Sequence, residues 1–114
     1  MNFYDAFSQK QKISIMAKWT RKQQEIENQK YFFNGGFFVT ATIKEALSDE
    51  DILFIYTDVR QFAEEKNGID YIQVYESDIG LTVWIIDELD KNMIESGEYD
   101  KEDNRCTLLF PSER

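Results

Sequence analysis

The sequence from Ile69 to Asp87 reads IDYIQVYE, SDIG and LTVWIID, and this stretch predicts a β-hairpin. Both outer runs are rich in the β-branched and aromatic residues that favour strands, and the polar segment between them contains Gly80. Because side chains alternate between the two faces of a strand, Ile72 and Val74 lie opposite Tyr75. The stretch therefore predicts the centre of a sheet that has aromatic residues on both faces.

The clearest helix signal lies directly before this hairpin. Ser48 can cap a helix, and the three acids that follow it favour the positive end of the helix dipole. Apolar residues then recur at helical spacing, at Ile52, Ile55, Tyr56, Val59, Phe62 and Ala63. Asn67 and Gly68 supply the left-handed conformation that ends a helix and lead into the hairpin.

The N-terminal part predicts a second main helix and another hairpin. The stretch from Gln9 to Gln29 contains no Gly or Pro, is rich in helix formers, and follows a possible N-cap at Ser8. Asn34-Gly35 stands between aromatic runs and favours a type I′ turn, although Gly36 could instead mark a bulge. A strand is expected over residues 37–43.

The C-terminal part predicts a short helix and a last strand. The helix is expected around Met93 to Ser96 and ends at Gly97, and a highly charged loop follows it. Cys106 to Phe110 reads as a strand that Pro111 prevents from continuing. We therefore expect one α+β domain over residues 1–114, with an antiparallel sheet of three to five strands and two main helices packed on one face.

The net charge of −9 is unevenly divided along the 114 residues. Residues 1–30, the predicted basic helix, hold six basic and three acidic side chains, whereas residues 31–114, the acidic body, hold seven basic and nineteen acidic ones. No apolar run approaches the roughly 18 to 20 residues that span a bilayer, and the N-terminus does not resemble a signal peptide. We therefore expect a cytoplasmic protein with no membrane partner.

Two absences argue against most enzyme classes. The chain has no histidine, which excludes Ser-His and Cys-His nucleophile pairs and histidine-ligated metals. Its single cysteine, Cys106, excludes disulfides within the chain and CxxC zinc or redox sites, and it is expected to be a small buried strand residue. We expect a non-enzymatic protein without a cofactor.

One acidic cluster permits an alternative. Asp87, Glu88 and Asp90 follow a predicted strand, a place where Mg²⁺-dependent nucleases often carry their carboxylates. The cluster lacks the Glu-x-Lys spacing of a common nuclease core. We favour a solvated acidic loop and keep a Mg²⁺-dependent carboxylate enzyme as the lesser alternative.

Three segments carry a resemblance to a known family. They are DYIQVYE from Asp70, VWIID from Val83 and TLLFPSE from Thr107. Over roughly residues 37–114 the chain resembles an uncharacterised family of small Firmicute proteins, found in staphylococci and on plasmids and phages, although Ser112 and Arg114 depart from its usual tail. The resemblance implies a fold and a mobile-element context, but no catalytic residues.

The distribution of acids suggests a binding function. Acidic groups spread over a small surface can imitate a phosphate array and associate quickly with a basic groove. We therefore expect an inhibitor of a host nucleic-acid-handling defence enzyme, of the anti-CRISPR or antirestriction type. The expected contact residues are Asp58, Glu64, Glu65, Tyr75, Asp87, Glu88, Asp90, Tyr99, Asp100, Glu102 and Asp103, with Tyr71 and Trp84 as further exposed anchors. The alternative is a nucleic-acid-binding accessory protein that acts through the basic helix, with Lys18, Arg21 and Lys22.

Overall fold

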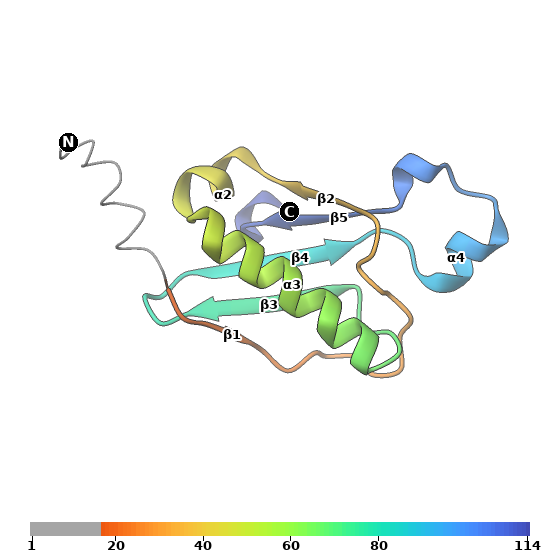
Figure 1. Cartoon of the computed structure of the whole chain (residues 1–114), viewed down its shortest axis with the longest axis horizontal. Coiled ribbons are helices and arrows are strands. Elements are labelled where there is room, and N and C mark those ends of the chain that lie inside the picture. Colours follow the sequence, from red (N-terminus) through yellow and green to blue (C-terminus); the bar gives the residue numbers. More distant parts are fainter. Residues whose placement is uncertain (1–16) are drawn as a thin grey trace.

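The computed structural model describes residues 17–114, which form a five-stranded mixed sheet with helices (Figure 1). The strands are β1 (Trp19–Arg21), β2 (Gly36–Val39), β3 (Ile72–Ser77), β4 (Thr82–Asp87) and β5 (Arg105–Leu109). The helices are α2 (Ala41–Ala46), α3 (Asp49–Glu65) and α4 (Lys91–Ser96), with short 3₁₀ turns η1 (Lys101–Asp103) and η2 (Pro111–Glu113). The predicted α+β class is confirmed.

The strands lie in the order β1-β3-β4-β5-β2. Three pairings are antiparallel, namely β1 with β3, β3 with β4, and β4 with β5. β2 lies parallel to β5 at one edge, which departs from the purely antiparallel expectation. Both edge strands therefore come from the N-terminal part of the chain, while β3, β4 and β5 form a continuous antiparallel meander.

The predicted central hairpin is confirmed as β3 and β4. Val74 lies opposite Trp84 in the register, and the Ser77 N–H donates to the Leu81 carbonyl at 2.9 Å across the turn. Gly80 has a φ of 89°, a left-handed conformation that glycine adopts at little cost. The local sequence therefore determines both strands and the turn that joins them.

The predicted helix after Ser48 is confirmed as α3. The Ser48 hydroxyl accepts a hydrogen bond from the Asp51 N–H at 3.1 Å, as its N-cap position predicts. Figure 1 shows α3 lying across one face of the sheet. The core between them contains Ile43, Ile55, Val59, Ala63, Tyr75, Val83, Ile85, Cys106 and Leu108, all fully buried. The predicted burial of Cys106 is confirmed.

The helix predicted from Gln9 to Gln29 is wrong where it can be compared. Residues 9–16 lie outside the described residues, and residues 17–29 contain no helix. Instead, β1 pairs antiparallel with Tyr75–Ser77 at the edge of the sheet. Aromatic and β-branched residues at Trp19 and Thr20 suit this pairing, and long-range strand contacts outweigh helix propensity.

The hairpin predicted at Asn34-Gly35 is also wrong. Tyr31 forms an isolated bridge with Ile69, while the chain beyond Gly35 enters β2 and pairs with β5. The strand ends at Val39, before the predicted residue 43. It ends there because the Thr40 hydroxyl accepts the Ile43 N–H at 3.3 Å and starts α2.

Candidate protein-binding site

Residues 88–104 connect β4 to β5 and project beyond the end of the sheet as a segment that we call the acidic arm (Figure 1). The acidic arm contains α4 and η1. It carries seven acidic and two basic side chains. No acid of the acidic arm forms an ion pair within residues 17–114, so its negative charge is not compensated locally.

The conformation of the acidic arm follows from a few local signals. The Asp90 carboxylate accepts the Met93 N–H at 2.8 Å and caps α4. Gly97 ends this helix with a φ of 74°, as its place in the sequence predicts. Asp90, an expected contact residue, therefore has a structural role as a cap and is only partly exposed.

Backbone contacts hold the acidic arm to the sheet and to the segment before β2. The Glu88 N–H donates to the Arg105 carbonyl at 3.0 Å, and the Lys91 N–H donates to the Lys30 carbonyl at 2.9 Å. Gly35 packs so closely on the end of the arm that an added Cβ would lie 2.0 Å from the Asn104 carbonyl oxygen. A side chain at position 35 is therefore excluded, which explains the glycine there without a hairpin.

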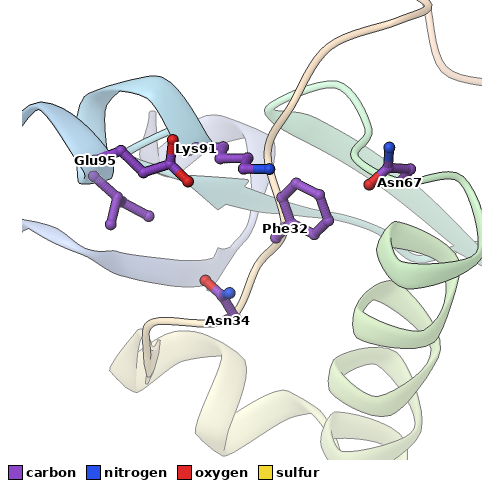
Figure 2. Close-up of a pocket in the computed structure, with 6 residues that line it drawn as sticks. Phe32, Asn34, Asn67, Lys91 and Glu95 are labelled. Carbon is purple, nitrogen blue, oxygen red and sulfur yellow. The ribbon is translucent and has the colours of Figure 1, made fainter.

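A hollow of about 350 Å³ separates the base of the acidic arm from the body. In Figure 2, Lys91 and Glu95 lie on α4 opposite Phe32 and Asn34. Asn67, directly after α3, forms another side of the hollow. The C-terminal end of α3 therefore faces the base of the arm.

The structure brings several of the expected contact residues together on the acidic arm. Glu88, Tyr99 and Asp103 line one pocket of about 260 Å³, whose other lining residues are Leu89, Met93 and Arg105. The Tyr99 side chain is 46% exposed, and Asp100 and Glu102 are exposed next to it in the chain. An accessible aromatic ring thus stands among free carboxylates.

Two further expected contact residues lie on the last turn of α3. Glu64 and Glu65 are both exposed there, and this turn carries no basic residue. Acids at the C-terminal end of a helix face the negative end of its dipole, which is unfavourable by a few tenths of a kcal/mol or up to about 1 kcal/mol each. Glu64 and Glu65 therefore place exposed negative charge at the end of α3.

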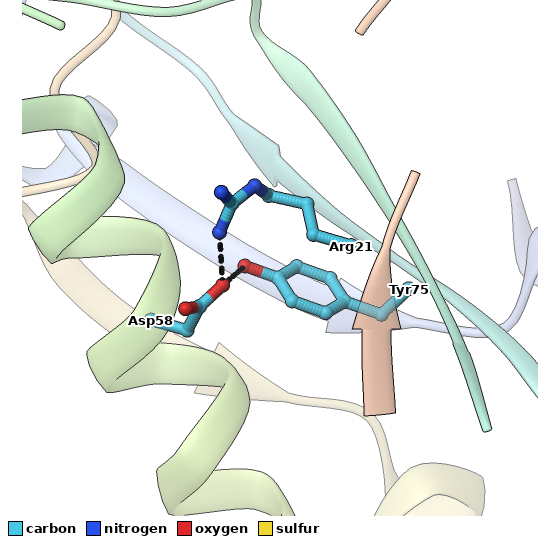
Figure 3. Close-up of polar contacts among 3 residues, drawn as sticks. All are labelled: Arg21, Asp58 and Tyr75. Carbon is cyan, nitrogen blue, oxygen red and sulfur yellow. Dashed lines mark hydrogen bonds and ion pairs between the residues drawn. The ribbon is translucent and has the colours of Figure 1, made fainter. Parts of the chain in front are cut away.

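Tyr75 is buried, so the prediction that it is an exposed anchor is wrong, and Asp58 is only partly exposed and is engaged within the fold. Tyr75 is fully buried, and its hydroxyl donates to Asp58 Oδ2 at 2.7 Å. The same oxygen pairs with Arg21 (Figure 3). Burial, together with the neighbouring Asp58 carboxylate, raises the pKa of Tyr75. These residues tie β3, α3 and β1 together.

Asp87 is also interior, and the prediction that it contacts a partner is wrong. It is 2% exposed, and its Oδ2 accepts the N–H of Phe33 at 2.9 Å, while its Oδ1 has no hydrogen-bond partner within residues 17–114. Burial raises the pKa of Asp87 to about 6, and burial next to Asp87 raises the pKa of Cys106 to about 12. Phe33 has a φ of 52°, so Asp87 supports an unusual backbone conformation.

The remaining expected anchors are less accessible than predicted. Tyr71, directly before β3, and Trp84 on β4 are both half-buried. Sequence reasoning also missed Arg21 as a structural residue. The signal that could have identified it is Asp58, an acid within the apolar stripe of α3 that includes Ile55 and Phe62. An acid at such a position requires a basic or hydrogen-bonding partner.

No protein-family model, curated protein or solved structure matches this chain. Among residues 17–114, no three His, Cys, Asp or Glu side chains are placed to hold a metal ion together. None of the helices in the same range is both long and apolar enough to cross a membrane.

Proposed function

We propose that this protein is a non-enzymatic binding module whose acidic arm contacts a basic surface on a partner protein. The most concrete version is an inhibitor of a nucleic-acid-handling defence enzyme of mobile-element hosts, in which the arm occupies the groove that nucleic acid would use. The partner is a protein with a basic nucleic-acid-binding surface.

The single observation that supports this proposal is the arrangement around Tyr99. Its exposed ring shares a pocket with Glu88 and Asp103, and none of the acids of the arm is paired within residues 17–114. Tyrosine is enriched among the residues that dominate binding energy at interfaces. Unpaired carboxylates add fast, salt-dependent association with a basic surface.

The hypothesis of a nucleic-acid-binding surface around Arg21 receives less support. Arg21 pairs with Asp58, and Lys22 lies 3.4 Å from Glu76, so both cations already have acidic neighbours. Phosphate binding would have to compete with these carboxylates. We therefore favour protein binding by the acidic arm over nucleic-acid binding around Arg21.

Affinity capture of the tagged full-length protein from a nuclease-treated cytosolic extract tests the proposal. The arm variant replaces Asp100, Glu102 and Asp103 with Lys. The matched control replaces the exposed Glu25, Glu27 and Glu45 with Lys, which changes the net charge equally at a distance along the chain from the arm. We expect one defined protein to be captured by the wild type and the control, to be lost with the arm variant, and to be displaced by added nucleic acid.

Two results would contradict the proposal. Equal capture by the arm variant would show that the arm does not bind, and equal loss in both variants would show that only net charge matters. Recovery of nucleic acid alone, lost on replacing Lys18, Arg21 and Lys22 with Glu, would favour the alternative function.

A further inference from the structure

The outer edge of β2 has backbone groups that no neighbouring strand uses. The Gly36 N–H donates to the Asn104 carbonyl at 2.9 Å, and the Thr40 N–H donates to the Leu108 carbonyl at 3.2 Å. Because alternate residues of a strand face the same neighbour, the N–H and C=O groups of Phe37 and Val39 point away from β5. β2 is the last strand of the sheet, so this edge is open among the described residues.

An apolar groove runs beside this edge. It has a volume of about 550 Å³ and lies between β2 and the N-terminal half of α3. Its lining residues are Phe37, Phe38, Val39, Lys44, Asp49, Ile52, Leu53 and Tyr56. The Phe37 and Tyr56 rings stack at a centroid distance of 4.2 Å, and together they form one side of the groove. Leu53 is 62% exposed on the α3 side of the groove. Phe38 is 53% exposed and contributes to the β2 side, although its ring points to the face of the sheet opposite α3.

One arginine adds positive charge close to the groove on the side of α3. The Arg60 guanidinium donates to the Tyr56 hydroxyl at 2.8 Å and lies 5.2 Å from the centre of that ring. Arg105 lies opposite Gly36 in the register, and its guanidinium lies 5.9 Å from the centre of the Phe38 ring, so it belongs to the opposite face of the sheet. Arg60 forms no ion pair within the described part of the chain. The groove therefore offers apolar walls with one unpaired cation beside them.

We propose that this groove binds an extended segment of a partner protein, which adds to β2 as a sixth strand. The main chain of the segment pairs with the outward N–H and C=O groups of Phe37 and Val39. Alternate apolar side chains enter the groove between β2 and α3, and an acidic side chain on the same face meets Arg60. Edge-strand addition of this kind takes affinity from backbone hydrogen bonds and specificity from alternate side chains. The occupant is a peptide segment rather than a helix because the unpaired groups are those of a strand.

This site is separate from the binding function proposed above. The charge-reversal variant of the acidic arm leaves every groove-lining residue unchanged. Failure of one proposal therefore leaves the other intact.

A displayed library of random twelve-residue peptides, selected on the full-length protein, tests the inference. We expect the enriched sequences to alternate apolar and polar residues and to carry an acidic residue toward one end. A synthetic peptide with the enriched sequence should protect the Phe37 and Val39 amides from hydrogen exchange, since these amides point away from β5 and have no strand partner among residues 17–114. Protection at these two positions distinguishes strand addition from other binding modes.

Matched variants locate the peptide on the groove. Leu53→Glu should weaken binding by about tenfold or more in fluorescence anisotropy, because it places a charge in the apolar wall. Ile79→Glu is the control, since Ile79 is similarly exposed at 55% but lies in the β3–β4 turn. Arg60→Glu should weaken binding of the acidic peptide and strengthen binding of the same peptide with Lys in place of its acid.

The inference is overturned if no peptide is enriched. It is equally overturned if a bound peptide leaves the Phe37 and Val39 amides unprotected, or if Leu53→Glu and Ile79→Glu behave alike. Sedimentation of the free protein adds a further check. A dimer that protects the same two amides without peptide would assign the edge to a second copy of this chain instead.

Discussion

The hydroxyl of Tyr75 on β3 donates a 2.7 Å hydrogen bond to the carboxylate of Asp58 on α3. The same carboxylate pairs with Arg21 on β1, whose guanidinium also lies 3.7 Å from the centre of the Phe62 ring. A short edge strand is thereby attached to both the helix and the sheet. Three strand residues alone would hold such an edge weakly.

Replacing Tyr75 with Phe tests this connection. The ring stays in the core while Asp58 loses one donor, so we expect the free energy of unfolding to fall by about 1–3 kcal/mol. Tyr71→Phe is the matched control, since Tyr71 is half-buried and its hydroxyl has no hydrogen bond within residues 17–114; it should change stability by less than about 0.5 kcal/mol. Urea unfolding measures both, and equal effects would contradict the role of the Tyr75 hydroxyl.

Asp87 should make stability depend on pH in the direction opposite to a salt-bridged acid. Its pKa of about 6 in the folded protein exceeds the value of about 3.9 for an unfolded chain, so the folded state holds the proton more tightly. This contribution is fully present below about pH 4 and is lost as the pH rises through 6. Asp87→Asn removes it while an amide oxygen can still accept the Phe33 N–H.

Urea unfolding from pH 3.5 to 7 measures this effect. We expect Asp87→Asn to gain stability relative to the wild type as the pH rises, by on the order of 3 kcal/mol at most. Asp87→Ala should show the same pH trend but be less stable than Asp87→Asn by about 1–3 kcal/mol at every pH, because the Phe33 N–H loses its acceptor. Parallel curves for wild type and Asp87→Asn would contradict the raised pKa.

Gly35 should tolerate no side chain. A Cβ there would lie 2.0 Å from the Asn104 carbonyl oxygen, so Gly35→Ala must displace the end of the acidic arm from β2. We expect a loss of about 3 kcal/mol or more in thermal or urea unfolding. Gly36→Ala is the control, because its Cβ would meet only the edge of the Phe38 ring at 3.3 Å, and this exposed ring can move. Similar losses in both variants would refute the close approach.

The acids at the end of α3 should reduce its stability. Glu64→Lys and Glu65→Lys each place a cation at the negative end of the helix dipole, so we expect each to raise the free energy of unfolding by about 0.3–1 kcal/mol at low salt. Glu50→Lys, in the first turn of the same helix, should lower it by a similar amount. Loss of this difference at high salt would support the electrostatic explanation, and a gain from all three substitutions would contradict it.

The elements that could be predicted from sequence are those whose signals are local. In α3, the cap at Ser48, the spacing of its apolar residues and the stop at Gly68 all agree, and the hairpin of β3 and β4 is similarly self-contained. β1 could not be predicted because three residues carry too little pattern to compete with helix propensity. β2 could not be assigned its partner because β5 is far away in the sequence, and Asn34-Gly35 supplied a nearer but wrong alternative.

The residues of the candidate site also divide into those that local sequence predicts and those whose position depends on distant contacts. The exposed positions of the acidic arm could be predicted because a charged loop after a strand is normally solvated. The burial of Asp87 could not, since it depends on the Phe33 N–H, which arrives from a distant segment. The burial of Tyr75 could not be predicted either. The alternation of side chains in β3 was evident from the sequence, but the sequence did not show which face of the sheet α3 covers.

The parallel pairing of β2 with β5 also has a consequence for synthesis on the ribosome. Residues 36–39 are synthesised long before their partner, residues 105–108. Until that partner is made, β2 has no strand to pair with, whereas β3 and β4 can already form their hairpin. The sheet therefore closes from its centre outward, and the edge formed by β2 is completed only after β5 has been synthesised.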